Sequence, residues 1–285
     1  MLKAMNHSFE QVRDHQKETW NKFSPGWKKW DEFTMAFLRP MGDEIIAALK
    51  PAGADHVLDI ATGTGEPGLT IAATIPAGQV IGTDLAEGML ATAAARAKER
   101  GLSNYRTQAA DVCALPFPDA TFDAISCRMG FMFFPDMALA TKEILRVLKP
   151  GGRFSTSVWS GGDRNPWVTT MMGAIDRHAP LPPPVPGAPG MFRCAAPGMI
   201  AGLLRAAGFG QVTEKEISGR VTYESPEQYW TMMMEVAAPV VNAMSKVDEA
   251  TRARIKADAL AALPRSADGV SLNFSARIIS GVKGV

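Results

Sequence analysis

The chain has 285 residues, of which 46% are hydrophobic and 21% charged, and 30 basic against 29 acidic side chains leave a net charge of +1. This balance argues against a dedicated nucleic-acid or membrane-surface binder, because such partners are held mainly by excess positive charge. No apolar run reaches the roughly 20 residues of a membrane span, and the N-terminus lacks the apolar core of a secretory signal. Three widely spaced cysteines fit a cytosolic protein without a disulfide framework or a cysteine-based zinc site.

Strands and helices are predicted to alternate after residue 55. Buried strands are expected at 57–61, 79–84, 104–108, 122–127 and 153–158. Helices are expected at 67–74, 86–100 and 136–148. The last helix should stop at Lys149-Pro150-Gly151-Gly152, because proline cannot continue a helix and glycine favours its end. This alternation predicts an α/β fold with a parallel, doubly wound sheet that is covered on both faces.

The C-terminal part departs from the repeat. Apolar residues alternate with mostly polar ones over 270–278, which predicts a half-exposed strand that pairs with 211–217 in antiparallel fashion at the sheet edge. Two insertions follow late strands. The first, 160–197, contains a polyproline-like stretch, and the second, 224–263, is predicted to be helical and opens with a capping box at Ser225-Pro226-Glu227-Gln228. Both should lie over the carboxyl edge of the sheet, where loops build binding sites.

A glycine-rich turn follows the first predicted strand. Gly63, Gly65 and Gly68 have the Gly-x-Gly-x-x-Gly spacing of a dinucleotide-binding turn, and Asp84 lies near the expected acidic position. Glycines let backbone N–H groups approach a ligand, and the Asp84 carboxylate can accept both hydroxyl protons of a ribose. Taken alone, this pattern also fits a nicotinamide-dependent oxidoreductase or a tight turn without a ligand.

Asp59 lies inside the apolar strand, four residues before Gly63. A buried carboxylate is costly unless it meets a cation or hydrogen-bond donors. The diphosphate of a nicotinamide dinucleotide would be repelled there, whereas the ammonium and sulfonium of S-adenosylmethionine (SAM) would be attracted. We therefore expect Asp59 to meet the amino-acid end of SAM.

Four blocks occur in an order that resembles class I SAM-dependent methyltransferases, closest to the branch typified by ubiquinone and menaquinone C-methyltransferases. They are 59–65, 84–90, 110–117 and 143–152. The resemblance implies a Rossmann-like sheet with strand order 3-2-1-4-5-7-6 and strand 7 antiparallel. It also implies SAM as cofactor and S-adenosylhomocysteine as product, without a metal.

The same resemblance implies the cofactor residues. The residues in the matching blocks are Asp59, Ala61, Thr62, Gly63, Gly65, Asp84, Leu85, Met89, Asp111 and Val112. Ala61 stands where many members carry glycine. In the family, the acid at Asp84 takes the ribose hydroxyls, the side chains at Leu85 and Met89 flank adenine, and the acid at Asp111 receives the exocyclic amine. Both acids could instead be helix N-caps, and Met89 could be plain core.

Residues 1–50 are expected to form an N-terminal helical lid ahead of a SAM-binding domain at 51–285. The resemblance implies that such a segment folds over the cofactor, where Trp27 could cover the sulfonium by a cation–π contact. The alternative, an aromatic side chain that docks a helix onto the core, applies most clearly to Trp20 and Trp30.

The acceptor pocket should lie over the end of the fourth strand and under the insertions. Methyl transfer from a sulfonium requires a nucleophile held close to the methyl group in a site that excludes water. Arg128 is the candidate for orienting an anionic or carbonyl-bearing acceptor and also for contacting the cofactor; a structural ion pair is its alternative. The candidate wall residues are Met129, Met132, Phe133, Trp159, Asn165, Trp167, Arg193, Tyr223, Tyr229 and Met233.

A general base is sought among four histidines. His7 and His15 are assigned to a mobile N-terminus, and His56 to the edge of the first strand away from the cofactor. His178 in the first insertion is the remaining candidate, with an ordinary surface position as its alternative.

The resulting hypothesis is a cytoplasmic SAM-dependent methyltransferase that acts on oxygen or carbon of an apolar or aromatic small molecule, with no nucleic-acid or membrane partner. A homodimer is one option for its assembly. The competing hypotheses are a nicotinamide-dependent oxidoreductase and a SAM-binding protein or enzyme that performs another reaction, such as cyclisation. The two insertions make the chain longer than the compact quinone enzymes that it resembles.

Overall fold

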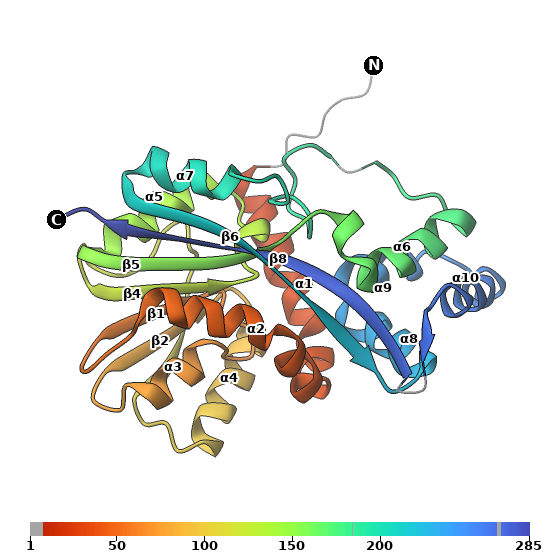
Figure 1. Cartoon of the computed structure of the whole chain (residues 1–285), viewed down its shortest axis with the longest axis horizontal. Helices are drawn as coiled ribbons and strands as arrows, with labels where there is room; N and C mark the ends of the chain where they lie inside the picture. The colour runs from red at the N-terminus through yellow and green to blue at the C-terminus, as the bar shows by residue number, and fades with distance from the viewer. Residues whose placement is uncertain (1–7, 184, 267–268) are drawn as a thin grey trace.

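One mixed sheet organises the computed structural model, which describes residues 8–183, 185–266 and 269–285 (Figure 1). Its strand order is β3-β2-β1-β4-β5-β8-β6, with β7 beside β8. The strands are β1 His56–Ile60, β2 Gln79–Asp84, β3 Tyr105–Ala109, β4 Phe122–Arg128, β5 Leu148–Trp159, β6 Phe209–Tyr223, β7 Arg265–Ser266 and β8 Gly269–Lys283. Strands β1 to β5 are parallel, and β8 is antiparallel to both β5 and β6. The predicted 3-2-1-4-5-7-6 topology is confirmed, with β8 as the predicted strand 7.

Helices cover the sheet and also gather beyond one end of it. They are α1 Phe9–Lys29, α2 Asp31–Leu49, α3 Gly68–Thr74, α4 Glu87–Glu99, α5 Met137–Val147, α6 Pro166–His178, α7 Met199–Ala207, α8 Pro226–Val236, α9 Ala238–Met244 and α10 Glu249–Ala261. Two short 3-10 helices, η1 Phe131–Phe133 and η2 Gly162–Arg164, follow β4 and β5. Figure 1 shows α6, α8, α9 and α10 clustered at one end of the molecule, beside the far ends of the long strands β6 and β8. Within the described ranges, no helix is long and apolar enough to cross a membrane.

The central strands form the core because their side chains are apolar on both faces. Val57 and Leu58 of β1 and Ile125 of β4 are fully buried, which is the usual condition of a parallel sheet between helical layers. Helix α5 buries Ile144 and Val147 from the stripe that its spacing predicts. This apolar stripe packs the helix onto the sheet.

The predicted boundaries agree closely with the observed ones, except at β5, β6 and β8. Helix α5 ends at Val147, as the Lys149-Pro150-Gly151-Gly152 signal predicts. Strand β5, however, begins at once with Leu148, which pairs with Phe122, and the register shifts before Arg153. An irregular stretch of strand therefore accommodates the proline and the glycines.

The two C-terminal strands are longer than predicted. β6 and β8 are 15 residues each and pair from Phe209–Lys283 to Tyr223–Val270. The antiparallel pair at the sheet edge is confirmed, with β6 outermost. Because both strands run past the end of β5, they carry the chain from the sheet to the second insertion.

At the start of the second insertion, Ser225 caps α8 by accepting the Gln228 N–H, but the Gln228 side chain bonds the Glu224 N–H and not that of Ser225.

Candidate functional site

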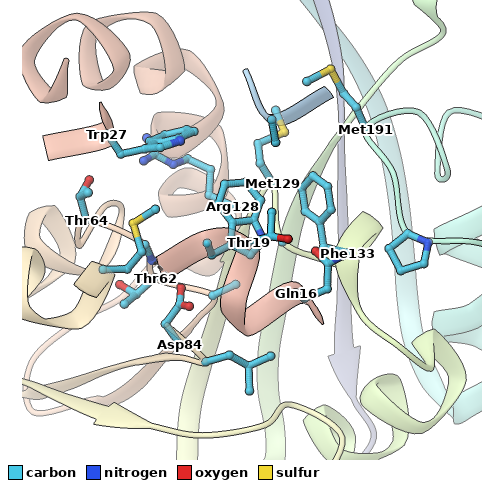
Figure 2. A pocket seen from close by; sticks show the side chains of 18 of the residues that line it. Gln16, Thr19, Trp27, Thr62, Thr64, Asp84, Arg128, Met129, Phe133 and Met191 are labelled. Carbon is cyan, nitrogen blue, oxygen red and sulfur yellow. Dashed lines mark hydrogen bonds between the residues drawn. The ribbon is translucent and has the colours of Figure 1, made fainter. Parts of the chain in front are cut away.

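A cavity of about 370 Å³ lies at the carboxyl ends of the parallel strands (Figure 2). Its walls come from the turns after β1 to β5, from α1 and α2, and from both insertions. Both insertions therefore lie over the carboxyl edge of the sheet, as predicted. The cavity has two chemically different sides. One is built by β1 to β3 and carries carboxylates, whereas the other is built by β4, β5 and the insertions and is largely apolar.

The turn after β1 presents its backbone to the cavity. Ala61 and Gly63 line the cavity and have left-handed backbone conformations, with φ of 51° and 54°. A side chain at Gly63 would meet no neighbouring atom. Glycine is favoured at this position because the positive φ strains the backbone of other residues. Thr62 also lines the cavity. Gly65 does not line it: a Cβ there would lie 2.5 Å from Leu69 Cδ1, so this glycine allows the turn to pack onto α3.

Asp59 is not among the residues that line the cavity. Its side chain is fully buried beneath the turn, where Oδ2 accepts hydrogen bonds from Thr62 Oγ1 (2.5 Å) and the Gly68 N–H (3.2 Å) and Oδ1 accepts one from Ser126 Oγ (2.6 Å). Burial raises the pKa of this carboxyl group to about 6. The side chain therefore does not reach the cavity surface, where the expected contact with a ligand ammonium would form. Asp59 braces the glycine turn from below.

Asp84 ends β2 and lines the cavity. Its Oδ2 accepts the Gly63 N–H at 3.0 Å and its Oδ1 accepts the Ala86 N–H at 2.9 Å. Burial raises its pKa. Each carboxylate oxygen thus receives one backbone N–H and keeps lone-pair capacity for a ligand hydroxyl. The neighbouring Leu85 and Met89 line the cavity beside it, as predicted.

Asp111 and Val112 line the cavity after β3, so the structure brings the predicted adenine block to the same opening. Asp111 Oδ1 accepts the Cys113 N–H at 2.8 Å, and its Oδ2 lies 4.0 Å from an Arg13 guanidinium nitrogen. The local bond to Cys113 shows that the side chain also stabilises its own turn. Asp111 therefore both stabilises its own turn and faces the cavity.

Arg128 ends β4 and lines the cavity, and Trp27 from α1 lies on the same side (Figure 2). The Arg128 side chain bonds only to Met35 Sδ, at 3.4 Å, among the described residues. Burial lowers its pKa, which nearby Glu66 and Asp59 partly offset. The alternative, an ion pair with an insertion, is not found among the described residues, since the acidic groups near Arg128 are Glu66, Asp59 and Asp31. The Trp27 Nε1 atom is buried and has no hydrogen-bond partner within the described ranges.

Four of the predicted acceptor-wall residues line the cavity: Met129, Phe133, Trp159 and Trp167. They come from the end of β4, η1, the end of β5 and α6. Met129 has a positive φ of 58°, which is strained for a side chain of this kind and is a feature that gathers at functional sites.

Six other predicted wall residues do not line the cavity. They are Met132, Asn165, Arg193, Tyr223, Tyr229 and Met233. The Asn165 side chain bonds the backbone oxygens of Ser160, Gly161 and Ser275, which ties the first insertion to β8. Arg193 donates to the Phe134 carbonyl oxygen at 2.5 Å.

The remaining four of these residues are core. Met132 and Met233 are fully buried and do not line the cavity. Tyr223 and Tyr229 pack edge to face with ring centroids 5.1 Å apart. The predicted wall positions were therefore wrong where the side chain packs in the core or bonds the neighbouring backbone.

His178 does not reach the cavity either. Its Nε2 lies 2.8 Å from Asp258 Oδ2 and joins the C-terminal end of α6 to α10. The proposed role as general base is therefore wrong, because this end of α6 faces α10. His15, assigned to a mobile N-terminus, instead lies on α1 and lines the cavity. His7 lies outside the described residues, and His56 opens β1 at the opposite end of the strand.

Several lining residues were not predicted. The N-terminal helices add His15, Gln16, Thr19, Trp20, Thr34, Phe37 and Leu38. The strand ends and their loops add Ile60, Thr64, Glu66, Thr83, Ala110, Gly130, Phe134 and Pro135. The insertions add Pro189, Gly190, Met191, Met232, Val236, Ala237, Ala238, Pro239 and Asn242. The spacing of Gln16, Thr19, Trp20 and Trp27 on one face of α1 is a signal that could have found the first group.

Comparisons with known proteins agree with a cavity that has a cofactor side and an acceptor side. Residues 57–152 match the family described as "Methyltransferase domain". Nocamycin O-methyltransferase of Saccharothrix syringae is 30% identical over 195 residues, which are 65% of this chain and 70% of that protein. Demethylmenaquinone methyltransferase of Thermus thermophilus is 47% identical over 98 residues, which are 34% of this chain. The match spans only 44% of that relative's length.

Solved structures show the same fold. The YcgJ protein of Bacillus subtilis superposes with a TM-score of 0.60 at 21% identity, covering 87% of this chain and 99% of that one. The [4+2]-cyclase SpnF gives a TM-score of 0.54 at 25% identity, covering 86% of this chain and 80% of that one. Membership of the methyltransferase family decides against the nicotinamide-dependent alternative. With the glycine turn and Asp84 at one cavity, these matches show that the chain belongs to the SAM-dependent methyltransferases.

Proposed function

We propose that the protein transfers a methyl group from SAM to an oxygen or carbon atom of an apolar or aromatic small molecule. Oxygen is favoured, because the match to the nocamycin enzyme covers 195 residues and thus extends beyond the stretch 57–152. The match to the demethylmenaquinone enzyme covers 98 residues, about the length of that stretch. The similarity to the O-methyltransferase therefore extends beyond the part of the chain that is expected to bind the cofactor.

The observation that carries the proposal is the geometry of Asp84 and Gly63. The Asp84 carboxylate faces the cavity, and each of its oxygens accepts one backbone N–H. Each oxygen therefore keeps a lone pair that can accept a ribose hydroxyl. Leu85, Met89 and Val112 offer apolar contacts to an adenine, and Asp111 offers an acceptor for its amine. When bound, SAM supplies a methyl group on a positively charged sulfur.

The other half of the cavity is proposed to hold the acceptor. Its side chains are mostly aromatic, methionine and proline, and they include Phe133, Trp159, Trp167, Met191 and Pro239. Such a wall orients an apolar molecule and excludes water from the methyl-transfer path. Methionines adapt their shape to irregular ligands, which suits a bulky acceptor.

Residues 8–50 are proposed to act as a lid over a domain formed by the rest of the chain. Helix α1 is attached to the first turn of α4, where Asn21 accepts the Gly88 N–H at 3.0 Å and donates to Glu87 at 3.1 Å. At its other end, Trp30 Nε1 donates to Glu235 of α8 at 2.6 Å. The helix thus joins the cofactor half to the second insertion.

The direct test is product analysis. Purified protein is incubated with SAM and a panel of phenols, enols and demethylmenaquinone, and both S-adenosylhomocysteine and the methylated product are measured by mass spectrometry. Equal amounts of the two products support the proposal. S-Adenosylhomocysteine binding without any methylated product across the panel, together with a rearranged acceptor, would contradict it.

Such a rearrangement is the second candidate function, an enzyme with a SAM-binding fold that catalyses cyclisation. The similarity to the [4+2]-cyclase SpnF supports it. The two candidates differ in one product, because a cyclase releases no S-adenosylhomocysteine.

A cytosolic location completes the proposal, and a homodimer stays one option for the assembly. Cys113, Cys127 and Cys194 are free thiols, which suits a reducing compartment. Cell fractionation and light scattering of the purified protein test these two points.

A further inference from the structure

Helices α1 and α9 bring four polar side chains to the cavity besides the tryptophans of α1. They are His15, Gln16, Thr19 and Asn242. None of these four side chains has a hydrogen-bond or ion-pair partner in the described part of the chain. His15 and Asn242 are exposed, so water can satisfy them, whereas Gln16 and Thr19 are half-buried. Gln16 and Thr19 are therefore the two whose polar atoms lack a partner inside the cavity.

Thr19 departs from the common behaviour of threonine inside a helix. The hydroxyl of a helical threonine often donates to the carbonyl oxygen one turn earlier. Thr34, Thr92 and Thr141 do so here, at 3.0, 3.1 and 2.6 Å. Thr19, in the middle of α1, makes no such bond to any residue that the structure describes. Its hydroxyl is therefore free to donate to a ligand and to accept from one.

Gln16 and Thr19 are neighbours on one face of the helix. Residues three apart in a helix project side by side, with Cβ atoms roughly 5 to 6 Å apart. Gln16 also lies one turn before Trp20, whose ring packs against Phe133 of η1 with ring centroids 5.1 Å apart. Figure 2 draws Gln16 at the Phe133 side of the cavity, across from Trp27. The pair Gln16 and Thr19 therefore reaches the cavity from the acceptor side.

The charged side chains next to this pair on α1 are already engaged. Arg13 donates to Asp14 at 2.9 Å, and Lys17 forms an ion pair with Glu87 at 2.5 Å. The amide and the hydroxyl of the pair carry no charge, yet each can both donate and accept a hydrogen bond. They therefore suit neutral oxygen functions, that is hydroxyl or carbonyl groups, and they do not balance the charge of a carboxylate or a phosphate.

We infer that Gln16 and Thr19 recognise two neutral oxygen functions on neighbouring carbon atoms of an otherwise apolar acceptor, with one hydrogen bond to each. The two oxygens must lie close together because the two side chains start within one helical turn. The inference rests on the proposed function and assigns the acceptor class to the same cavity. A polar group left unpaired by the wrong ligand is costly, so the pair discriminates against molecules that lack these oxygens.

The test measures binding to the full chain saturated with S-adenosylhomocysteine, by fluorescence titration at neutral pH. The probes share one ring system: naphthalene, 2,3-dihydroxynaphthalene and 2,7-dihydroxynaphthalene. The wild type should bind the 2,3 isomer at least about tenfold more tightly than naphthalene. It should also prefer the 2,3 isomer to the 2,7 isomer by about fivefold, because the oxygens of the 2,7 isomer lie too far apart to meet both residues.

Thr19→Val keeps the shape of the side chain but loses the hydroxyl, and Gln16→Leu loses the amide. Each should weaken binding of 2,3-dihydroxynaphthalene about 5- to 10-fold and leave naphthalene within about twofold of wild type. Thr19→Ser keeps the hydroxyl and should keep the wild-type preference. Glu18→Gln, which changes an exposed residue of α1, is the matched control and should change neither affinity.

Equal binding of the two dihydroxynaphthalenes by the wild type would overturn the inference. An equal loss of naphthalene and 2,3-dihydroxynaphthalene in Thr19→Val or Gln16→Leu would overturn it as well, because the residue would then only shape the wall. So would weaker binding of S-adenosylhomocysteine in these variants, which would place the pair at the cofactor. Should Gln16→Leu fail to fold, Thr19→Val and Thr19→Ser decide the matter. Failure of the wild type to bind S-adenosylhomocysteine would instead contradict the proposed function.

Discussion

The two sides of the cavity differ in how they are built. On the cofactor side, Gly63, Asp84 and Asp111 belong to turns that follow consecutive strands, and local backbone hydrogen bonds hold their side chains and N–H groups in place. On the acceptor side, the lining residues come from α1, α2 and two insertions that are far apart in the chain. Local bonding makes the first side a property of short motifs, whereas the second depends on how distant segments pack.

The sharpest test of this comparison concerns Asp59, which belongs to the cofactor side but faces away from the cavity. Its pKa of about 6 lies above the unfolded value of 3.8, so the native state retains a proton that the unfolded state loses. Stability from this group is present below about pH 4 and is lost as pH rises through 6. The difference in unfolding free energy between wild type and Asp59→Asn should therefore shift by at most about 3 kcal/mol.

Urea unfolding at several pH values between 4 and 8 measures this shift. The wild type should lose stability relative to Asp59→Asn over that range. A constant difference between the two proteins would show that the carboxyl group titrates normally and is not confined under the turn.

The next largest effect is expected at Asp84. Asp84→Ala leaves two ribose hydroxyls without a charged acceptor and should weaken S-adenosylhomocysteine binding about 100-fold. Calorimetry measures this, with Asp43→Ala as control because Asp43 is exposed on α2. An affinity within threefold of wild type would contradict the assignment of Asp84 to the ribose.

On the acceptor side, Met191 tests whether the two sides are separate. Met191→Ala removes apolar contact from the first insertion and should raise the KM for the acceptor about tenfold. Binding of S-adenosylhomocysteine should stay within twofold of wild type. An equal loss for both ligands would mean that Met191 supports the whole cavity and does not contact the acceptor.

The link between the sides is expected to have a smaller effect. Glu87→Ala removes a partner of Asn21 and of Lys17 in α1 and should raise the dissociation rate of S-adenosylhomocysteine two- to fivefold, because exposed contacts of this kind are weak. Stopped-flow displacement measures the rate. Glu99→Ala, at the other end of α4, is the control, and an unchanged rate in Glu87→Ala would argue against a lid.

The smallest effect is expected at His178. Because its imidazole bonds Asp258 between α6 and α10, His178→Asn should leave kcat within twofold of wild type at every pH tested. A pH profile of methyl transfer measures this. Loss of a basic limb in the profile would restore His178 as a base and contradict its placement.

The cofactor side was largely predictable because its signals are short and contiguous. The motif around Gly63 and the acids at Asp84 and Asp111 were placed correctly at the cavity. Gly65 and Asp59 were exceptions: Gly65 packs the turn onto α3, and the burial of Asp59 was foreseen but its partners were not. Thr62 and Gly68 are local, yet Ser126 comes from β4, and the three together hold the carboxylate under the turn.

The acceptor side was only partly predictable. Met129 and Phe133 directly follow β4, so their place at the cavity follows from the strand itself. Tyr229 and Met233 lie on α8, where helical periodicity does not tell which face meets the cavity and which meets the other insertion. His15 was missed for the same reason, since the course of α1 over the sheet depends on its contacts with α4 and α8.

The sequence by itself determined the alternation of strands and helices, the glycine turn and the acids that follow β2 and β3, because each depends on residues that are neighbours in the chain, whereas the strand order was implied by the family resemblance. Only the tertiary structure decided which insertion residues face the cavity, that Asp59 is turned away from it, and that Arg128 and Trp27 lie on the same side. The physical reason is that a buried side chain takes whichever partners the packing supplies, and those partners here come from segments that only the fold brings together.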